Sequence, residues 1–135
     1  MGTTVGLRVP ATPDHLTMLR ALAETVTLVA DFGLGEVNDI RLALDEVATL
    51  LMLAAVPGSM LDCELTYDEQ ELAVRVAGVA GSEDALDEHG LSWHIVRSLT
   101  DSLVTDQGVY AIPAGGYPTV VEFRRLRDAR RNSTR

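Results

Sequence analysis

Residues 36–55 read EVNDIRLALDEVATLLMLAA, and this stretch decides the fold. At about 100° per residue, four of its aliphatic side chains fall on one face of a helix: Ile40, Leu44, Val47 and Leu51. Pro57 and Gly58 then end the helix, because proline cannot continue it and glycine favours a turn. The sequence therefore predicts a long amphipathic helix over about 36–55, whose apolar stripe packs into the core.

Shorter elements flank this helix on both sides. Alternating apolar residues over 4–9 predict a strand that ends at Pro10. Thr12 followed by Pro13 predicts the N-terminus of another helix, which ends near Asp31. Its inward side chains are expected to be Leu16, Leu19, Ala23 and Val26. Downstream, the pattern predicts strands at 61–67 and 71–77, a loop at 78–90, a helix over about 91–102 with Ile95 and Leu99 inward, and strands at 103–106 and 118–126.

The order of these elements is β-α-α-β-β-loop-α-β-β. A long hairpin followed by C-terminal strands favours an α/β (α+β) two-layer sandwich, in which about three helices cover one face of a mixed, mostly antiparallel sheet. A chain of 135 residues has the usual length of one domain. We therefore expect a single domain over residues 1–126, followed by a basic, disordered tail at 127–135.

Charge is distributed unevenly along the chain. The net charge is −9, yet six of the 11 arginines occupy the last twelve residues. Residues 1–126 hold 19 acidic and 7 basic side chains, which leaves that part of the chain at −12. Such a surface repels a nucleic-acid backbone and suits a basic protein partner, although an acidic surface also simply keeps a domain soluble.

Several other classes of function have no support in the sequence. No apolar run is long enough to cross a membrane, and residues 1–10 are not typical of a secretory signal. The one cysteine, Cys63, excludes an internal disulfide, fits a reducing cytoplasm and is expected to be a buried, inert thiol within a strand. There is no P-loop, dinucleotide fingerprint or zinc-ligand spacing, and the three histidines lie far apart.

Three segments, in their order along the chain, carry a resemblance. They are RLALDEVATL at 41–50, VRVAG at 74–78 and GLSWHIVR at 90–97. Together with the order of elements, they resemble the GHKL (histidine-kinase-like) ATPase superfamily over about residues 4–126. Within that superfamily the chain resembles the anti-sigma-factor branch, the RsbW-like serine kinases.

The resemblance implies a nucleotide site whose ligands are degenerate. Glu46 falls where the family places a catalytic base, although a solvated helix carboxylate is the alternative interpretation. Leu50 replaces the asparagine that holds Mg²⁺, and an aliphatic group cannot join an oxygen shell. Val76 falls where an aspartate reads the adenine amino group, and valine cannot accept that hydrogen bond.

The glycine boxes and the ATP lid of the family are also altered. The resemblance implies that Gly78 and Gly90 are kept, that Ala80 and Ser92 replace partner residues of the boxes, and that Thr119 matches a threonine near the nucleotide. The lid segment, 79–89, is shorter than usual and carries four carboxylates, which repel a triphosphate. We therefore expect no cofactor and no metal.

What the resemblance implies about function is a protein-binding regulator. The preferred interpretation is a cytoplasmic anti-sigma factor that sequesters an alternative sigma factor without kinase activity, and that is itself held by an anti-anti-sigma protein. Family members dimerise through the first strand and helix, and Arg20 aligns with an arginine of the first helix that touches partners. The alternative is an active serine kinase that uses Mg-ATP to phosphorylate the anti-anti-sigma antagonist. A third possibility is a sandwich domain of different purpose. No direct contact with nucleic acid or membrane is expected.

Overall fold

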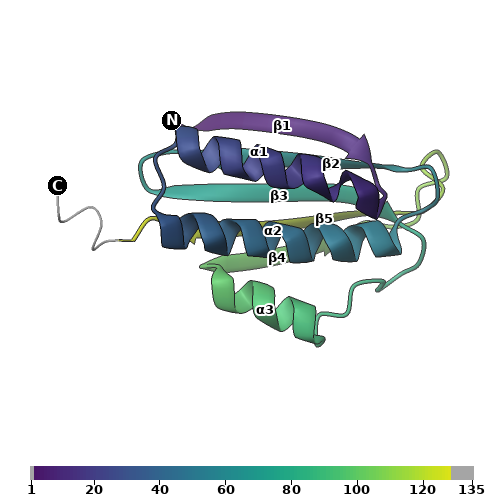
Figure 1. The fold of residues 1–135 in the computed structure, drawn as a ribbon. Coiled ribbons are helices and arrows are strands. Elements are labelled where there is room, and N and C mark those ends of the chain that lie inside the picture. The colour runs from purple at the N-terminus through teal and green to yellow at the C-terminus, as the bar shows by residue number, and fades with distance from the viewer. Residues whose placement is uncertain (1, 129–135) are drawn as a thin grey trace.

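The computed structural model describes residues 2–128 (Figure 1). The elements in chain order are β1 (Thr3–Pro10), a 3₁₀ turn (Pro13–His15), α1 (Leu16–Val29), α2 (Leu34–Ala54), β2 (Met60–Tyr67), β3 (Glu71–Ala80), α3 (Leu91–Leu99), β4 (Ser102–Gln107) and β5 (Tyr117–Leu126). The predicted order of elements is confirmed. No helix within residues 2–128 is both long and apolar enough to cross a membrane.

The five strands form one sheet in the order β1-β2-β3-β5-β4, and the helices cover one of its faces (Figure 1). The predicted two-layer sandwich is therefore confirmed. Every strand pair in the described chain is antiparallel, so the parallel pairing implied by a mixed sheet does not occur. The reason is topological: the crossover through α3 makes β4 run in the direction of β3, but β5 lies between them.

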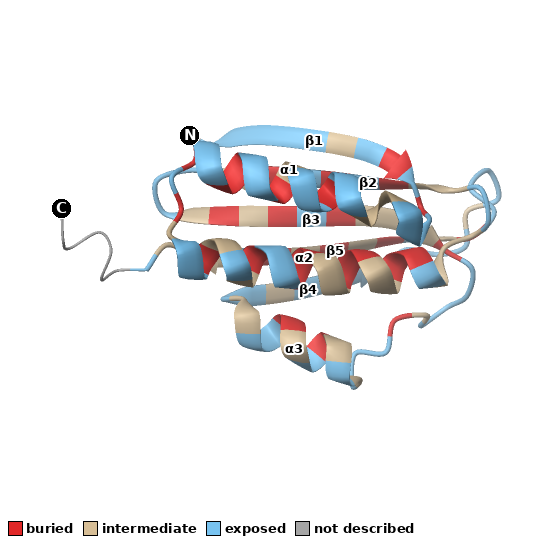
Figure 2. Ribbon diagram, in the orientation of Figure 1, coloured by how far each residue is buried: buried red, intermediate tan, exposed pale blue. Residues whose placement is uncertain are grey.

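The core lies between the helices and the sheet (Figure 2). All four side chains of the predicted α2 stripe are buried, and α1 adds three of its four predicted inward residues, Leu19, Ala23 and Val26. Leu16 is only partly buried. In α3 the fully buried side chains are Trp93 and Val96, whereas Ile95 and Leu99 are half-buried, so the predicted inward face of this helix is rotated.

Helix ends depart from the predicted positions where side chains bond locally. Thr12 is the N-cap residue of a 3₁₀ turn that begins at Pro13 and precedes α1, but its side chain does not cap the backbone, and its Oγ1 lies 2.8 Å from His15 Nδ1. The α2 helix begins two residues earlier than predicted, because the Glu36 carboxylate accepts a hydrogen bond from the Gly33 amide at 2.5 Å. The α3 helix ends at Leu99, since Thr100 is extended and its hydroxyl donates to the Val96 carbonyl.

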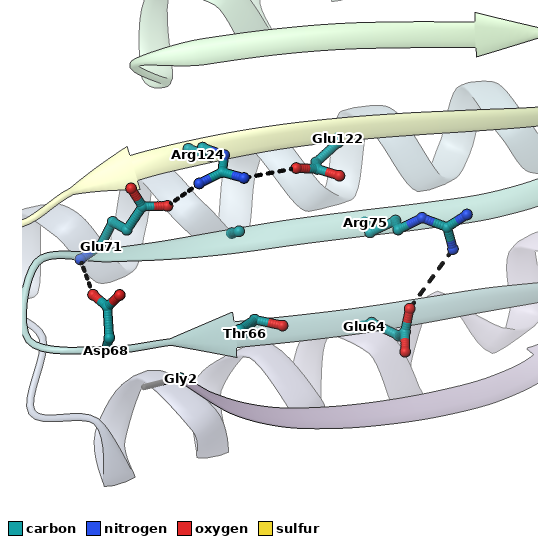
Figure 3. A pocket seen from close by; sticks show the side chains of 9 residues that line it. Gly2, Glu64, Thr66, Asp68, Glu71, Arg75, Glu122 and Arg124 are labelled. Atoms are coloured by element: carbon teal, nitrogen blue, oxygen red, sulfur yellow. Dashed lines mark hydrogen bonds and ion pairs between the residues drawn. The ribbon is translucent and has the colours of Figure 1, made fainter.

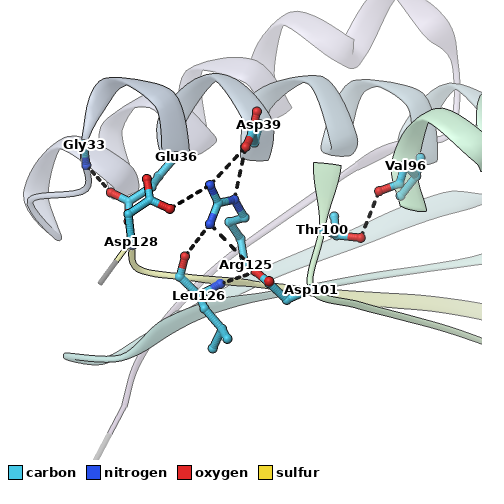
Figure 4. Close-up of polar contacts among 9 residues, drawn as sticks. All are labelled: Gly33, Glu36, Asp39, Val96, Thr100, Asp101, Arg125, Leu126 and Asp128. Carbon is cyan, nitrogen blue, oxygen red and sulfur yellow. Dashed lines mark hydrogen bonds and ion pairs between the residues drawn. The ribbon is translucent and has the colours of Figure 1, made fainter. Parts of the chain in front are cut away.

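The end of β5 and the residues after it are fastened to the beginning of α2 and to the residues just before it (Figure 4). Glu36 is fully buried, and its second carboxylate oxygen accepts from the Asp128 amide at 2.5 Å. Arg125 lies 3.1 Å from the Asp39 carboxylate, and the Arg127 guanidinium stacks 3.9 Å from the centre of the Phe32 ring. Of the predicted tail, Arg127 and Asp128 are thus held by the domain, and 129–135 lie outside the described residues.

Candidate functional site

The family's base position lies in the middle of α2 on a surface that is largely apolar. Glu46 is half-buried, and its carboxylate makes no hydrogen bond or ion pair with any part of the chain that the structure describes. One turn later Leu50 packs against the core, and Leu53 is exposed. Because aliphatic side chains have no lone pair, this face of α2 cannot complete the oxygen shell that Mg²⁺ requires.

The position expected to read adenine lies inside the sheet. The sequence predicts that the strand ends at residue 77, which is wrong: β3 continues to Ala80. Its last residues are fastened to the end of α2, since the Val56 amide donates to the Val79 carbonyl and the Gly81 amide to the Ala54 carbonyl, both at 2.9 Å. Val76 is paired with Val121, and both are fully buried. Its side chain is part of the core.

Two of the predicted site residues do lie together. Gly78 and Thr119 are directly opposed partners on β3 and β5. The space above Gly78 is nevertheless occupied, because a Cβ atom added there would lie 2.9 Å from Leu61 Cδ1. Ala80, two residues along the same strand, is also buried. A side chain at position 78 would therefore have to displace Leu61.

Gly90, the residue of the second glycine box that this chain keeps, has a local structural role. Gly90 precedes α3, and a Cβ atom at this position would lie 2.8 Å from an Asp87 carboxylate oxygen. The Gly90 amide also donates to the Asp87 carbonyl at 3.1 Å. Ser92 is half-buried in the first turn of the helix. The turn from Asp87 to Gly90 explains the glycine without a ligand.

The remaining space beside Thr119 is small. A cavity of about 40 Å³ is lined by Asp84, Ala85, Leu86, Glu88, Thr105, Gln107 and Thr119. The Thr119 hydroxyl donates to the Tyr117 carbonyl at 2.9 Å and accepts from the Gln107 amide group at 3.1 Å. Gln107 in turn accepts from the Asp84 amide at 2.9 Å, which ties the acidic loop to the sheet. Drug-sized ligands occupy pockets of roughly 300–1,000 Å³, so these residues do not fit a nucleotide.

A metal site has no better support from the side chains present. Within residues 2–128, no group of three or more His, Cys, Asp and Glu side chains is placed to hold a metal ion. Cys63 is buried in β2, and its burial raises the pKa of the thiol to about 12. It is the inert strand cysteine that the sequence predicts.

Arg20, the candidate partner contact, lies on the outer side of α1 and is paired within the chain. Its guanidinium binds the Asp45 carboxylate through two nitrogens, at 2.9 and 3.1 Å. The hydrogen bond and the charge of Asp45 raise the pKa of Arg20. A second pair, Glu24 with Arg41 at 3.2 Å, also joins α1 to α2. Sequence reasoning found Arg20 but not Asp45, because an ion pair between two helices leaves no local pattern.

The helix-free face of the sheet carries a ladder of charges (Figure 3). Arg124 lies 2.6 Å from Glu71 and 3.2 Å from Glu122, and Arg75 lies 3.6 Å from Glu64. They line a hollow of about 330 Å³. Exposed pairs of this kind contribute little stability, and the ladder keeps this face polar.

Comparison with known proteins identifies relatives of this chain. No family model matches it. The chain is 31% identical over 101 residues to the anti-sigma-F factor RsbW of Mycobacterium tuberculosis, in strain CDC 1551 / Oshkosh and in strain H37Rv. The match includes 75% of this chain and 60% of each relative, so the chain spans less than two-thirds of the length of the curated relatives it matches.

Proposed function

This chain is a homologue of the anti-sigma-F factor RsbW, and from this we propose that it is an anti-sigma factor that sequesters an alternative sigma factor by direct protein contact, without phosphoryl transfer. The homology supports the sigma-factor partner. The chemistry of the degenerate site supports the lack of phosphoryl transfer, and the observation that carries this part is the hydrocarbon at the ligand positions. Leu50 and Val76 offer no lone pairs, and Leu61 fills the space above Gly78.

Charge supplies the first part of the binding mechanism. Residues 1–126 have a net charge of −12, and sigma factors, which work on DNA, are expected to present basic surface. Complementary fields raise the rate of diffusional encounter and are screened by salt. The acidic body therefore steers a sigma factor toward the chain before any specific contact forms.

Arg20 supplies a specific contact in this proposal. Its side chain is 46% exposed, and Asp45 holds the planar guanidinium on the outer surface of α1 and α2. An incoming carboxylate can share the guanidinium or replace Asp45, because the fork of donors suits bidentate pairing. Asp45 thus presents Arg20 to a partner in an ordered geometry.

Dimerisation through the first strand and helix belongs to the same proposal. β1 is an edge strand of the sheet, and residues 3–6 are exposed. An edge strand offers unpaired backbone groups that a second copy can use. An anti-anti-sigma protein is the proposed antagonist, and a cytoplasmic location follows from a sigma-factor partner.

An active kinase is the second candidate, and one observation favours it. Glu46 is half-buried without an ion-pair partner among the residues described, as a general base would be. The metal and the adenine would then need ligands other than Leu50 and Val76. Phosphate transfer from Mg-ATP to a serine of the antagonist, lost in Glu46→Ala, would establish this candidate in place of ours.

Co-expression with each alternative sigma factor of the source organism tests the main proposal. We expect one sigma factor to co-purify with the chain. When the chain is added to a reconstituted polymerase assay, transcription from the promoter of that sigma factor should fall. The dissociation constant of the purified sigma complex, measured with and without Mg-ATP, should be the same. If no sigma factor binds the purified chain, the proposal is wrong.

A further inference from the structure

Residues 108–117, which comprise the loop between β4 and β5 and the first residue of β5, are here called the hairpin tip (Figure 1). The hairpin tip exposes large apolar side chains. Val109 is 86% exposed, Tyr110 53% and Ile112 85%. Soluble proteins rarely leave several large apolar side chains together in solvent unless they bind something. The hairpin tip contains none of the residues that the resemblance assigns to the nucleotide site, and it does not contain Arg20.

Two backbone hydrogen bonds order the hairpin tip. The Gly108 amide donates to the Pro118 carbonyl at 2.7 Å, and the Ala111 amide donates to the Gly116 carbonyl at 2.8 Å. The Tyr110 ring meets the Tyr117 ring edge-on, with the ring centres 5.4 Å apart. A loop ordered before binding loses less conformational entropy in a complex.

Close packing against the rest of the molecule fixes where the hairpin tip points. A Cβ atom at Gly116 would lie 2.5 Å from the Ala80 carbonyl oxygen and 2.8 Å from a Val56 methyl carbon. Glycine is therefore required there, and the base of the hairpin tip abuts the joined ends of α2 and β3. The exposed side chains are presented from a rigid support.

Acidic side chains border this apolar surface. Gln107, at the base of the hairpin tip, bonds the Asp84 amide at 2.9 Å and the Ser82 carbonyl at 3.4 Å, which places the loop 81–90 beside it. Four carboxylates on that loop are exposed: Glu83, Asp84, Asp87 and Glu88. Neither 81–90 nor 108–117 contains an arginine or lysine. An anionic lipid surface would be repelled, whereas an apolar surface with basic flanks would be complementary.

We propose that the hairpin tip is a second docking surface for the sigma factor, and that it takes an amphipathic segment whose apolar face is bordered by Arg or Lys side chains. Val109, Tyr110 and Ile112 contact the apolar face, and the carboxylates of 81–90 face the basic border. This inference rests on the proposed anti-sigma function and adds a contact separate from Arg20.

Binding of the co-purifying sigma factor by variants that introduce a negative charge at the hairpin tip tests the inference. Ile112→Asp should weaken the sigma complex at least tenfold, and Val109→Asp should act in the same direction, while Ile112→Leu binds like the unaltered chain. The matched control is Leu34→Asp, which adds the same charge at a side chain that is 78% exposed, at the first turn of α2 at the other end of the molecule. An acidic residue is favourable at a helix N-terminus, so this control should fold and bind normally.

Four outcomes overturn the inference. The first is that the unaltered chain binds sigma while Ile112→Asp and Val109→Asp bind equally well, which leaves the anti-sigma function intact. The second is that Leu34→Asp loses as much affinity as the tip variants, which makes added charge the cause. The third is that Ile112→Asp abolishes self-association, or binding to phosphatidylglycerol vesicles, without changing sigma affinity. The fourth is that the unaltered chain binds no sigma factor, which removes both the inference and its premise.

Discussion

Adding Mg-ATP to the purified chain should leave its thermal unfolding unchanged. The proposed function predicts this result, because the positions that bind nucleotide in the family carry hydrocarbon here. Leu50 packs against the core, Val76 is fully buried opposite Val121, and Leu61 lies over Gly78. We expect the midpoint of unfolding with 1 mM Mg-ATP to equal the midpoint without it.

The size of the expected defect follows from the structure. Loss of the acceptor for a polar group costs ~1–3 kcal/mol of binding free energy. The substitutions at Leu50 and Val76 together therefore weaken nucleotide binding by a factor of roughly 30 or more. Space adds a second penalty. The cavity beside Thr119 has a volume of about 40 Å³, against roughly 300–1,000 Å³ for pockets that hold drug-sized ligands. A nucleotide would have to move the loop 81–90, which lines this cavity, before it could bind there.

Differential scanning fluorimetry is sensitive enough to decide the question. A ligand at one hundred times its dissociation constant stabilises the folded state by about 2.7 kcal/mol. For a domain of this size, that free energy raises the midpoint of unfolding by roughly 10 °C. An active kinase of the same superfamily, measured with the same nucleotide, serves as the positive control. A rise of several degrees that saturates with nucleotide, or a clear calorimetric isotherm at micromolar ATP, would refute the reasoning.

Four further predictions concern single side chains. Glu46→Ala should leave sigma binding unchanged in a pull-down titration, and a loss of phosphate transfer to an antagonist in this variant would contradict that. Arg20→Ala should weaken sigma binding at least tenfold while the unfolding midpoint barely moves. Asp45→Ala, which removes the other side chain of the same ion pair, is the matched variant. Surface plasmon resonance should also show that association with sigma slows as the salt concentration rises. Glu36→Ala should lower the free energy of unfolding in urea by about 3 kcal/mol, because the Gly33 and Asp128 amides both lose their buried carboxylate acceptor. A loss below about 1 kcal/mol would be inconsistent with the two bonds. Cys63, with its pKa raised to about 12 by burial, should react with a disulfide reagent at pH 8 only after unfolding, so rapid labelling of the native chain would contradict its placement.

The sequence determined the elements that a local period encodes. The α2 stripe of Ile40, Leu44, Val47 and Leu51 repeats at helical spacing, and the whole stripe is buried. Strand alternation likewise located the hairpin of β2 and β3. The element order was enough to identify the two-layer sandwich, and substitutions such as Leu50 and Val76 are visible in the sequence itself.

Only the tertiary structure decided which distant residues meet. Glu36 binds the amide of Asp128, 92 residues away, and that contact extends the domain past its predicted end. Leu61 fills the space above Gly78, and β5 separates β3 from β4, which makes every described strand pair antiparallel. The glycine and proline residues of the hairpin tip are those of an ordinary loop, and the exposure of its apolar side chains appears only once the chain is folded. These features depend on contacts between segments far apart in the chain, and a local hydrophobic period carries no record of them.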